Sequence, residues 1–211
     1  WTYGERILAQ LVSLIVSIVL ARLLSPEDYG IISLVLVFIT LANVIVSDGF
    51  GNALIQKKNA DNIDFSSMLY FSIGCGIALY GILFCTAPLI ASYYELPALT
   101  AVIRVLSMKI PIASVNSIQQ AYVSKKMQFK KFFYATLVGT ITSGCIGIFL
   151  AYKGFGVWAL VIQYLTNSIM DTAFLAVTIG WKPQLVFRWA RVRKMLGFAA
   201  RILAVAVMIS L

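Results

Sequence analysis

Histidine is absent from the 211 residues, only 12% of them are charged, and cysteine occurs three times. The cysteines, Cys75, Cys85 and Cys145, each fall inside an apolar run, so the sequence predicts neither a zinc site nor a disulfide framework. The charged fraction is about half of that in soluble globular proteins. These shortages exclude a soluble single domain.

Motifs for enzyme chemistry are also missing. The chain has no phosphate-binding glycine loop, no serine elbow and no pair of close carboxylates. Its eight acidic residues are scattered, whereas a lipid-phosphate transferase needs clustered carboxylates to hold a metal ion. The sequence therefore predicts no enzyme activity, no cofactor and no metal site.

Apolar runs dominate what is present: 61% of the residues are hydrophobic, and the mean hydropathy is +0.91. About 20 apolar residues in a helix cross the hydrocarbon core of a bilayer. The pattern predicts an all-α, polytopic membrane helix bundle with six complete transmembrane helices and the start of a seventh. The six runs cover 7–24, 31–47, 65–91, 99–121, 132–152 and 157–179.

Charge is distributed unevenly between the loops, with 17 basic against 8 acidic residues, a net charge of +9. Only Arg22 and Lys153 lie on the side of the odd-numbered loops. Lys and Arg are enriched in the cytoplasmic loops of membrane proteins. The N-terminus is thus predicted in the cytoplasm, and nucleic-acid binding is not needed to explain the charge. Twelve basic residues lie on the other side: Arg6, Lys57, Lys58, Lys125, Lys126, Lys130, Lys131, Lys182, Arg188, Arg191, Arg193 and Lys194.

The pattern divides the chain into three parts. Residues 1–181 are expected to form a six-helix transmembrane lobe, and residues 198–211 the truncated start of a second lobe. Between them, residues 182–197 place apolar and basic side chains on separate helical faces, as in an amphipathic helix on the cytoplasmic membrane surface. Because the chain starts with Trp1 and stops inside an apolar run, we interpret it as a fragment.

Ionisable residues inside the spans are the strongest functional signal, since a charge at the bilayer centre costs about 2.5 to 3.5 kcal/mol. Lys109 lies about ten residues into its span, with Asn116 and Gln120 on the same helical face. Arg104 lies about five residues in, where an interfacial anchor is an equally good interpretation.

Other spans carry similar polar stripes. Asp171 closes a stripe with Gln163 and Asn167, Asp48 ends another, and both carboxylates are candidates for ion coupling. The alternatives are structural hydrogen bonds between helices and, for the carboxylates, structural roles at the helix ends. The other polar stripes are Thr40, Asn43 and Ser47, and Gln10, Ser13 and Ser17, while Gly139, Ser143 and Gly147 form a close-packing face.

Lys109, Arg104 and Asp171 together favour a hydrated cavity of net positive character at membrane depth. Such a cavity suits an anionic amphiphile, for example a lipid whose phosphate headgroup passes through the protein while its tail stays in hydrocarbon.

Several segments, in this order and spacing, resemble the bacterial polysaccharide flippases of the multidrug, oligosaccharidyl-lipid and polysaccharide exporter superfamily. Residues 21–30 (ARLLSPEDYG) and 47–58 (SDGFGNALIQKK) resemble the first hairpin of that family. Residues 127–132 (MQFKKF) and 154–161 (GFGVWALV) resemble the loop before its fifth span and the turn into its sixth.

The resemblance implies a transporter that moves undecaprenyl-pyrophosphate-linked oligosaccharide from the inner to the outer leaflet of the bacterial inner membrane. It implies alternating access between two six-span lobes, of which this chain matches the first. It also implies that basic residues in the cavity bind the pyrophosphate or acidic sugars. The candidates for this role are Arg22, Arg104 and Lys109. The partners implied are membrane lipids, a polysaccharide polymerase and glycosyltransferases.

Two other functions stay open. A drug/cation exporter of the same superfamily would prefer acidic and aromatic cavity residues. A non-transporting membrane scaffold of a polysaccharide-synthesis complex would use the basic loops for docking.

Overall fold

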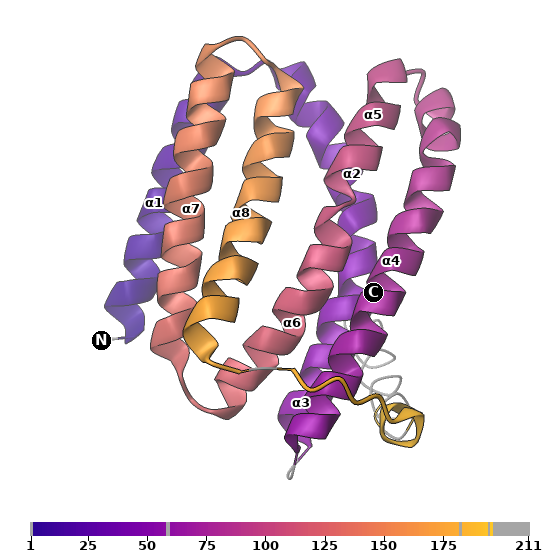
Figure 1. The fold of residues 1–211 in the computed structure, drawn as a ribbon. Helices are drawn as coiled ribbons and strands as arrows, with labels where there is room; N and C mark the ends of the chain where they lie inside the picture. Colours follow the sequence, from indigo (N-terminus) through magenta and orange to yellow (C-terminus); the bar gives the residue numbers. More distant parts are fainter. Residues whose placement is uncertain (1, 58–59, 182, 194, 196–211) are drawn as a thin grey trace.

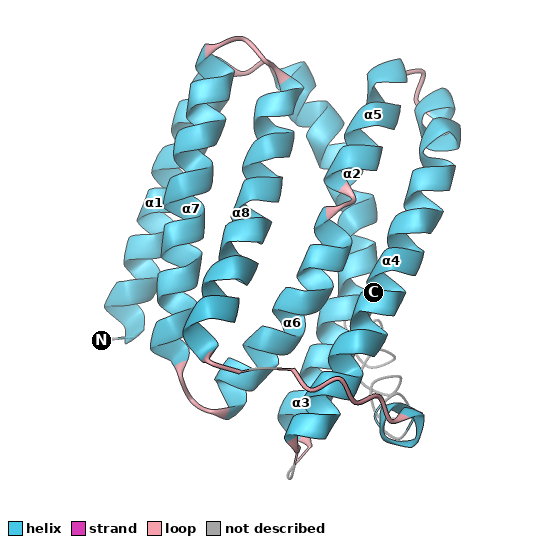
Figure 2. Cartoon of the chain, in the orientation of Figure 1, coloured by secondary structure: helices cyan, strands magenta, loops and turns pink. Residues whose placement is uncertain are grey.

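A computed structural model describes residues 2–57, 60–181, 183–193 and 195, which form helices joined by short loops and contain no strand (Figure 2). The helices stand side by side in one bundle, with the N-terminus at the lower end in Figure 1. Their order and bounds are α1 (Thr2–Leu23), α2 (Pro26–Asn43), η1 (Val44–Gly51), α3 (Asn52–Gln56), α4 (Asn62–Tyr93), α5 (Pro97–Leu106), α6 (Lys109–Lys125), α7 (Phe129–Tyr152) and α8 (Val157–Ile179).

Five helical stretches among the described residues are long and apolar enough to cross a bilayer: α2, α4, α5 with α6, α7 and α8. The 32 residues of α4, at about 1.5 Å each, exceed the roughly 30 Å of hydrocarbon. The apolar part of α1 is shorter, Gln10–Leu23. The predicted all-α polytopic bundle is confirmed, while the predicted number of six complete spans depends on α1.

A capping box and a glycine form the turns at the upper end of the bundle. Ser25 caps α2: its Oγ accepts a hydrogen bond from the backbone N–H of Asp28 (3.2 Å), and the Asp28 carboxylate accepts one from the Ser25 N–H (3.2 Å). Gly156 precedes α8 with φ of +53°, and a Cβ there would lie 3.1 Å from Asp28 Oδ1. The α7–α8 turn therefore packs against the α1–α2 turn, and glycine permits both the conformation and the approach.

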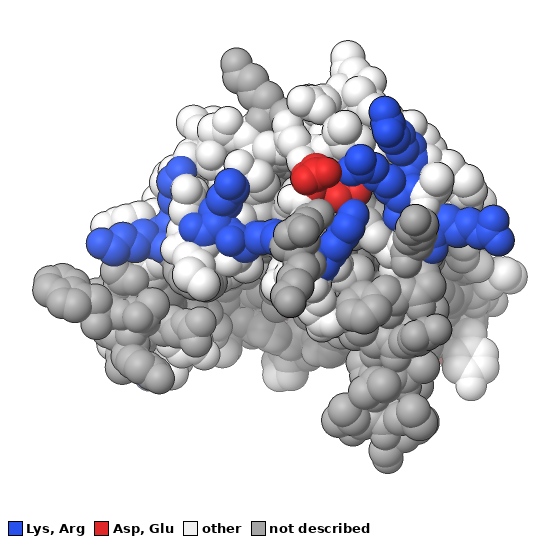
Figure 3. Space-filling model, turned by 90° about the horizontal axis from the view of Figure 1, so that it is seen from below, with Lys and Arg blue, Asp and Glu red and all other residues white. Residues whose placement is uncertain are grey.

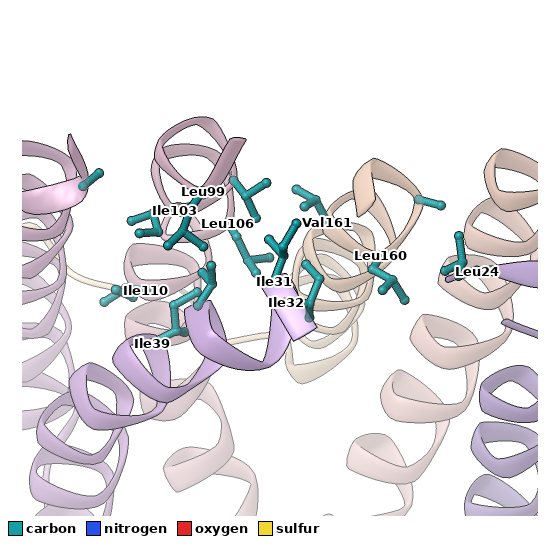
Figure 4. Close-up of a cluster of buried hydrophobic side chains, with 14 of the residues drawn as sticks. Leu24, Ile31, Ile32, Ile39, Leu99, Ile103, Leu106, Ile110, Leu160 and Val161 are labelled. Atoms are coloured by element: carbon teal, nitrogen blue, oxygen red, sulfur yellow. The ribbon is translucent and has the colours of Figure 1, made fainter. Parts of the chain in front are cut away.

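The main apolar core lies around α2, which packs against α5, α6 and α8. Figure 4 shows side chains from these helices converging on one another. The buried residues labelled there are Leu24, Ile31, Ile32, Ile39, Leu99, Ile103, Leu106, Ile110, Leu160 and Val161. Their burial fixes α2 at the centre of the bundle and so positions the polar residues that follow it.

The helix after α2 differs from the sequence prediction. Instead of ending near residue 47, the chain continues as the π-helix η1 and then as α3. Gly51 of η1 allows a close approach to α6, because a Cβ there would lie 3.1 Å from Ser117 Oγ. π-Helical segments are often found at functional sites.

The predicted single span 99–121 is divided into α5 and α6 at Ser107 and Met108. Pro111 explains the break, because it has no N–H to donate and its ring clashes with the carbonyl four residues earlier. The Ser107 carbonyl accepts instead from the Ile110 N–H at 2.9 Å. Lys109 is consequently the first residue of α6 and lies directly at the break.

Glycine brings α7 into close contact with its neighbours. A Cβ at Gly147 would lie 3.0 Å from the Gln163 side chain, and one at Gly139 only 2.0 Å from Asp171 Oδ1. On the other side, a Cβ at Gly144 would lie 2.5 Å from a methyl group of Val16 in α1. The predicted close-packing face of α7 is confirmed.

The segment after α8 is only partly helical in its described residues, whereas the sequence predicts an amphipathic helix within residues 182–197. Residues 183–188 are not helical, while the described residues that follow them, 189–193 and 195, are helical. Two backbone N–H groups of this part, those of Gln184 and Arg188, bond to side chains of α4 instead of to helical carbonyls. Lys182, Lys194 and residues 196–197 lie outside the described residues.

We call residues 183–193 the strap, because they bind along the beginning of α4. The Gln184 N–H donates to Ser66 Oγ (2.9 Å), and the Arg188 N–H donates to Ser67 Oγ (3.2 Å). Figure 1 shows the segment crossing the lower end of the bundle from α8 to α4.

Asp64 fastens the strap at its far end. This fully buried carboxylate pairs with Lys57 Nζ at 2.6 Å and with Arg191 Nη1 at 3.0 Å. Hydrogen bonding to Asp64 raises the pKa of the Arg191 guanidinium and so favours its charged form. Asp64 thus joins α4, the loop after α3 and the strap.

We expect Asp64→Asn to lower the free energy of unfolding of the full-length protein by about 2 kcal/mol. The value is below the 3 to 5 kcal/mol for breaking a fully buried pair because Lys57 and Arg191 are partly exposed. The control is Asp61→Asn, since Asp61 is 66% exposed and asparagine also caps helices. Thermal unfolding in detergent measures both, and equal melting temperatures would refute a fastening role for Asp64.

Candidate substrate cavity

A cavity of about 370 Å³ lies between η1 and α3 on one side and α6 and α8 on the others. Most of its polar lining residues belong to α6 and α8. Its lining residues are Asn43, Gly51, Asn52, Ile55, Lys109, Ala113, Asn116, Ser117, Gln120, Ala121, Ser124, Asn167, Ser168 and Asp171. The cavity brings together Lys109, Asn116, Gln120, Asn167 and Asp171, five of the residues selected from the sequence.

The wall formed by α6 is held by hydrogen bonds and one cation–π contact. The Lys109 ammonium lies 5.2 Å from the centre of the Tyr164 ring in α8. Asn116 Nδ2 donates to Thr172 Oγ1 at 3.2 Å, and Gln120 Nε2 donates to Asn116 Oδ1. The contacts of Lys109 and Asn116 tie the polar face of α6 to α8, while the Gln120 hydrogen bond lies within α6.

The wall formed by α8 rests on α7. Asn167 Nδ2 donates to Ser143 Oγ at 3.4 Å, while Asp171 Oδ1 is buried against Gly139 without a hydrogen-bond partner. No ion pair joins Lys109 and Asp171, although both line the cavity. The amine and the carboxylate are both available to other partners in the cavity.

Two more oxygen atoms in the lining residues have no partner, Asn43 Oδ1 and Ser117 Oγ. Buried polar atoms are nearly always hydrogen-bonded to protein or to water. The lining is therefore suited to water molecules or to a hydroxyl-rich ligand.

Three predicted site residues lie elsewhere. Arg22 is exposed at the upper end of α1, and Gln163 packs against Gly147. Arg104 lies in α5 above the helix break, where its guanidinium stacks 4.5 Å from the centre of the Phe84 ring. Asp48 belongs to η1, and its side chain lies outside the described part of the structure.

The described lining carries less positive charge than the sequence predicts. Without Arg22 and Arg104, the described lining contains one ammonium, Lys109, and one carboxyl group, Asp171. The polar stripe of α1 does not contribute either, since Gln10, Ser13 and Ser17 are exposed.

Sequence reasoning missed Asn52 and Ser117 in the lining. Ser117 lies one residue after Asn116 and eight after Lys109, so helical spacing could have placed it on this face. Asn52 had no such signal, because it reaches the cavity only through the π-helical turn of η1. Among the described residues, no group of three or more Cys, Asp or Glu could hold a metal ion.

Comparison with known proteins gives consistent matches. The chain is 23% identical over 181 residues to the succinoglycan biosynthesis transport protein ExoT of Rhizobium meliloti (strain 1021), covering 86% of this chain and 37% of that protein. It is 24% identical over 190 residues to the lipopolysaccharide biosynthesis protein WzxC of Escherichia coli (strain K12), with the same coverage.

A third relative is the teichuronic acid biosynthesis protein TuaB of Bacillus subtilis (strain 168), 25% identical over 161 residues, or 75% of this chain and 33% of that protein. The matched part of the chain thus covers about a third of the length of these relatives. No solved structure matches it.

The model of one protein family, described as polysaccharide biosynthesis protein, matches residues 19–211, which include every helix that lines the cavity. The chain belongs to this family of polysaccharide biosynthesis proteins.

Proposed function

We propose that this chain forms the first lobe of a flippase in the bacterial inner membrane. Its substrate would be an undecaprenyl-pyrophosphate-linked oligosaccharide, moved from the inner to the outer leaflet for cell-surface polysaccharide assembly. The relatives support this substrate class, since one is named a transport protein and all three are named for the biosynthesis of a polysaccharide or lipopolysaccharide.

The observation that carries the proposal is the position of Lys109. Its ammonium lies at a helix break in the middle of a membrane-crossing stretch, in a cavity lined by amides and hydroxyls. A half-buried ammonium at this depth needs water or an anion, and a pyrophosphate provides the anion. Amides and hydroxyls are suitable hydrogen-bond partners for sugar hydroxyl groups.

Alternating access would expose the cavity first to the cytoplasm, where the N-terminus lies in this proposal, and then to the outside. A second lobe would close the cavity from the opposite side. Asp171 is the candidate for ion coupling: when it is protonated, Lys109 is the only charge in the described lining. The glycosyltransferases would act before the transport step, and the polysaccharide polymerase after it.

The test is transport by the full-length protein reconstituted in vesicles. We expect a fluorescent lipid-linked oligosaccharide to move between leaflets at a rate above that of protein-free vesicles. Transport of an organic cation dye instead would indicate a drug exporter. If folded protein transports neither compound, the scaffold function is favoured and the proposal fails.

A further inference from the structure

A second pocket, of about 700 Å³, lies at the lower end of the bundle, away from the substrate cavity. It forms where α4 begins, α6 ends and the chain leaves α8. Its walls include the rings of Phe65, Tyr122 and Trp181 and the side chains of Lys125 and Lys126. Because three stretches long enough to cross a membrane begin or end here, we expect the pocket at the level of the lipid headgroups.

The three rings of the aromatic wall pack against one another. The Trp181 ring stacks on the Tyr122 ring, with centres 5.5 Å apart and planes 22° from parallel. Phe65 packs edge-on against both rings, at 5.3 and 6.1 Å, and Trp181 Nε1 donates to Asn62 Oδ1. Tryptophan and tyrosine are enriched at the membrane–water boundary because their rings are amphipathic.

The charged wall is positive. Lys126 is exposed, and its ammonium lies 6.0 Å from the centre of the Tyr122 ring. The Lys125 ammonium is held in place by the backbone carbonyls of Leu54 and Lys57, to which it donates. An ammonium has three donors, so Lys125 keeps one for a ligand.

Nearby carboxylates do not neutralise these lysines, since other cations pair with them. Asp64 binds Lys57 and Arg191, and Asp61 lies 3.4 Å from Arg191. Figure 3 shows the lower face, where Lys and Arg side chains lie beside a small acidic group and at several other places on that face. The beginning of α4 adds the positive end of a 32-residue helix.

We propose that this pocket binds the phosphate headgroup of an anionic membrane lipid. The phosphate would contact Lys125 and Lys126, and the upper part of the acyl chains would lie against the aromatic rings. The wall combines positive charge with apolar rings, which suits an amphiphile better than a free phosphate ion. This site does not depend on the proposed transport function.

The test uses native mass spectrometry of the full-length protein in mild detergent, with phosphatidylglycerol as the probe. We expect Lys126→Gln to reduce bound phosphatidylglycerol about fivefold, the effect of one lysine near an anionic surface. Lys126→Arg should retain binding. Lys130→Gln is the matched control, because Lys130 is exposed near the same end but does not line the pocket.

Two comparisons identify the source of the phosphate. Phosphatidylcholine should bind less than phosphatidylglycerol, and excess inorganic phosphate should not displace the lipid. Equal loss of lipid in Lys126→Gln and Lys130→Gln would overturn the proposal. So would equal binding of the two lipids, or displacement by inorganic phosphate.

Discussion

Lys109→Ala is expected to reduce surface polysaccharide at least about tenfold while leaving a normal amount of folded protein in the membrane. The substitution removes the only ammonium in the described lining, and a loss of about 1.4 kcal/mol in substrate binding alone gives a factor of ten. Lys109→Arg keeps the charge and should retain part of the activity. The measurement is surface polysaccharide in cells whose only copy carries the variant, with membrane protein quantified in parallel.

The same experiment separates a ligand role from a structural one. Lys109 forms no ion pair with Asp171, so its removal leaves no carboxylate deprived of a direct partner in the described structure. Lys130→Ala, at an exposed position, is the control for general effects of lost charge. Normal polysaccharide with normal amounts of Lys109→Ala protein would refute the ligand role, and loss of folded protein would favour a structural role.

Gly139→Ala is expected to lower both transport and stability, although the change adds only one methyl group. A Cβ at this position would lie 2.0 Å from Asp171 Oδ1 and 3.0 Å from its Cγ, so either α7 or the carboxylate must move. Overpacking of this kind costs about 1 to 3 kcal/mol. We expect transport to fall about tenfold, measured in vesicles together with the melting temperature.

The matched control is Gly74→Ala in α4, because no atom lies within 4 Å of the added methyl group. Alanine favours a helix more than glycine does, so this control should keep or slightly raise stability. If Gly139 acts by positioning Asp171, then Gly139→Ala should cost much less in an Asp171→Ala background. Equal costs in both backgrounds would contradict the positioning role.

Helical spacing was sufficient to predict the face of α6 that lines the cavity. Lys109, Asn116 and Gln120 recur at i, i+7 and i+11, and all three line it. The same reasoning placed Asn167 and Asp171 together on α8. The apolar runs likewise predicted a polytopic helical bundle, because hydrophobic length depends on composition and not on contacts.

Helical spacing could not predict which helix faces pack against each other. A polar stripe shows that a helix has a distinct face but not which neighbour meets it. The exposure of the α1 stripe and the packing of Gln163 against Gly147 were therefore not predictable. The break before Lys109 separates Arg104 from the cavity, although both lie in one apolar run. The π-helix η1 also has no periodic signature, yet it brings Asn52 to the lining.

The most direct test of the central claim is the accessibility of a cysteine in the cavity. In full-length protein whose native cysteines are replaced, Gln120→Cys should react with a membrane-impermeant maleimide, whereas Ile77→Cys on the exposed apolar surface of α4 should not. Lipid-linked oligosaccharide should slow the reaction at position 120. If position 120 is as unreactive as position 77, or reacts at the same rate with and without the lipid-linked sugar, the cavity is not the substrate pathway.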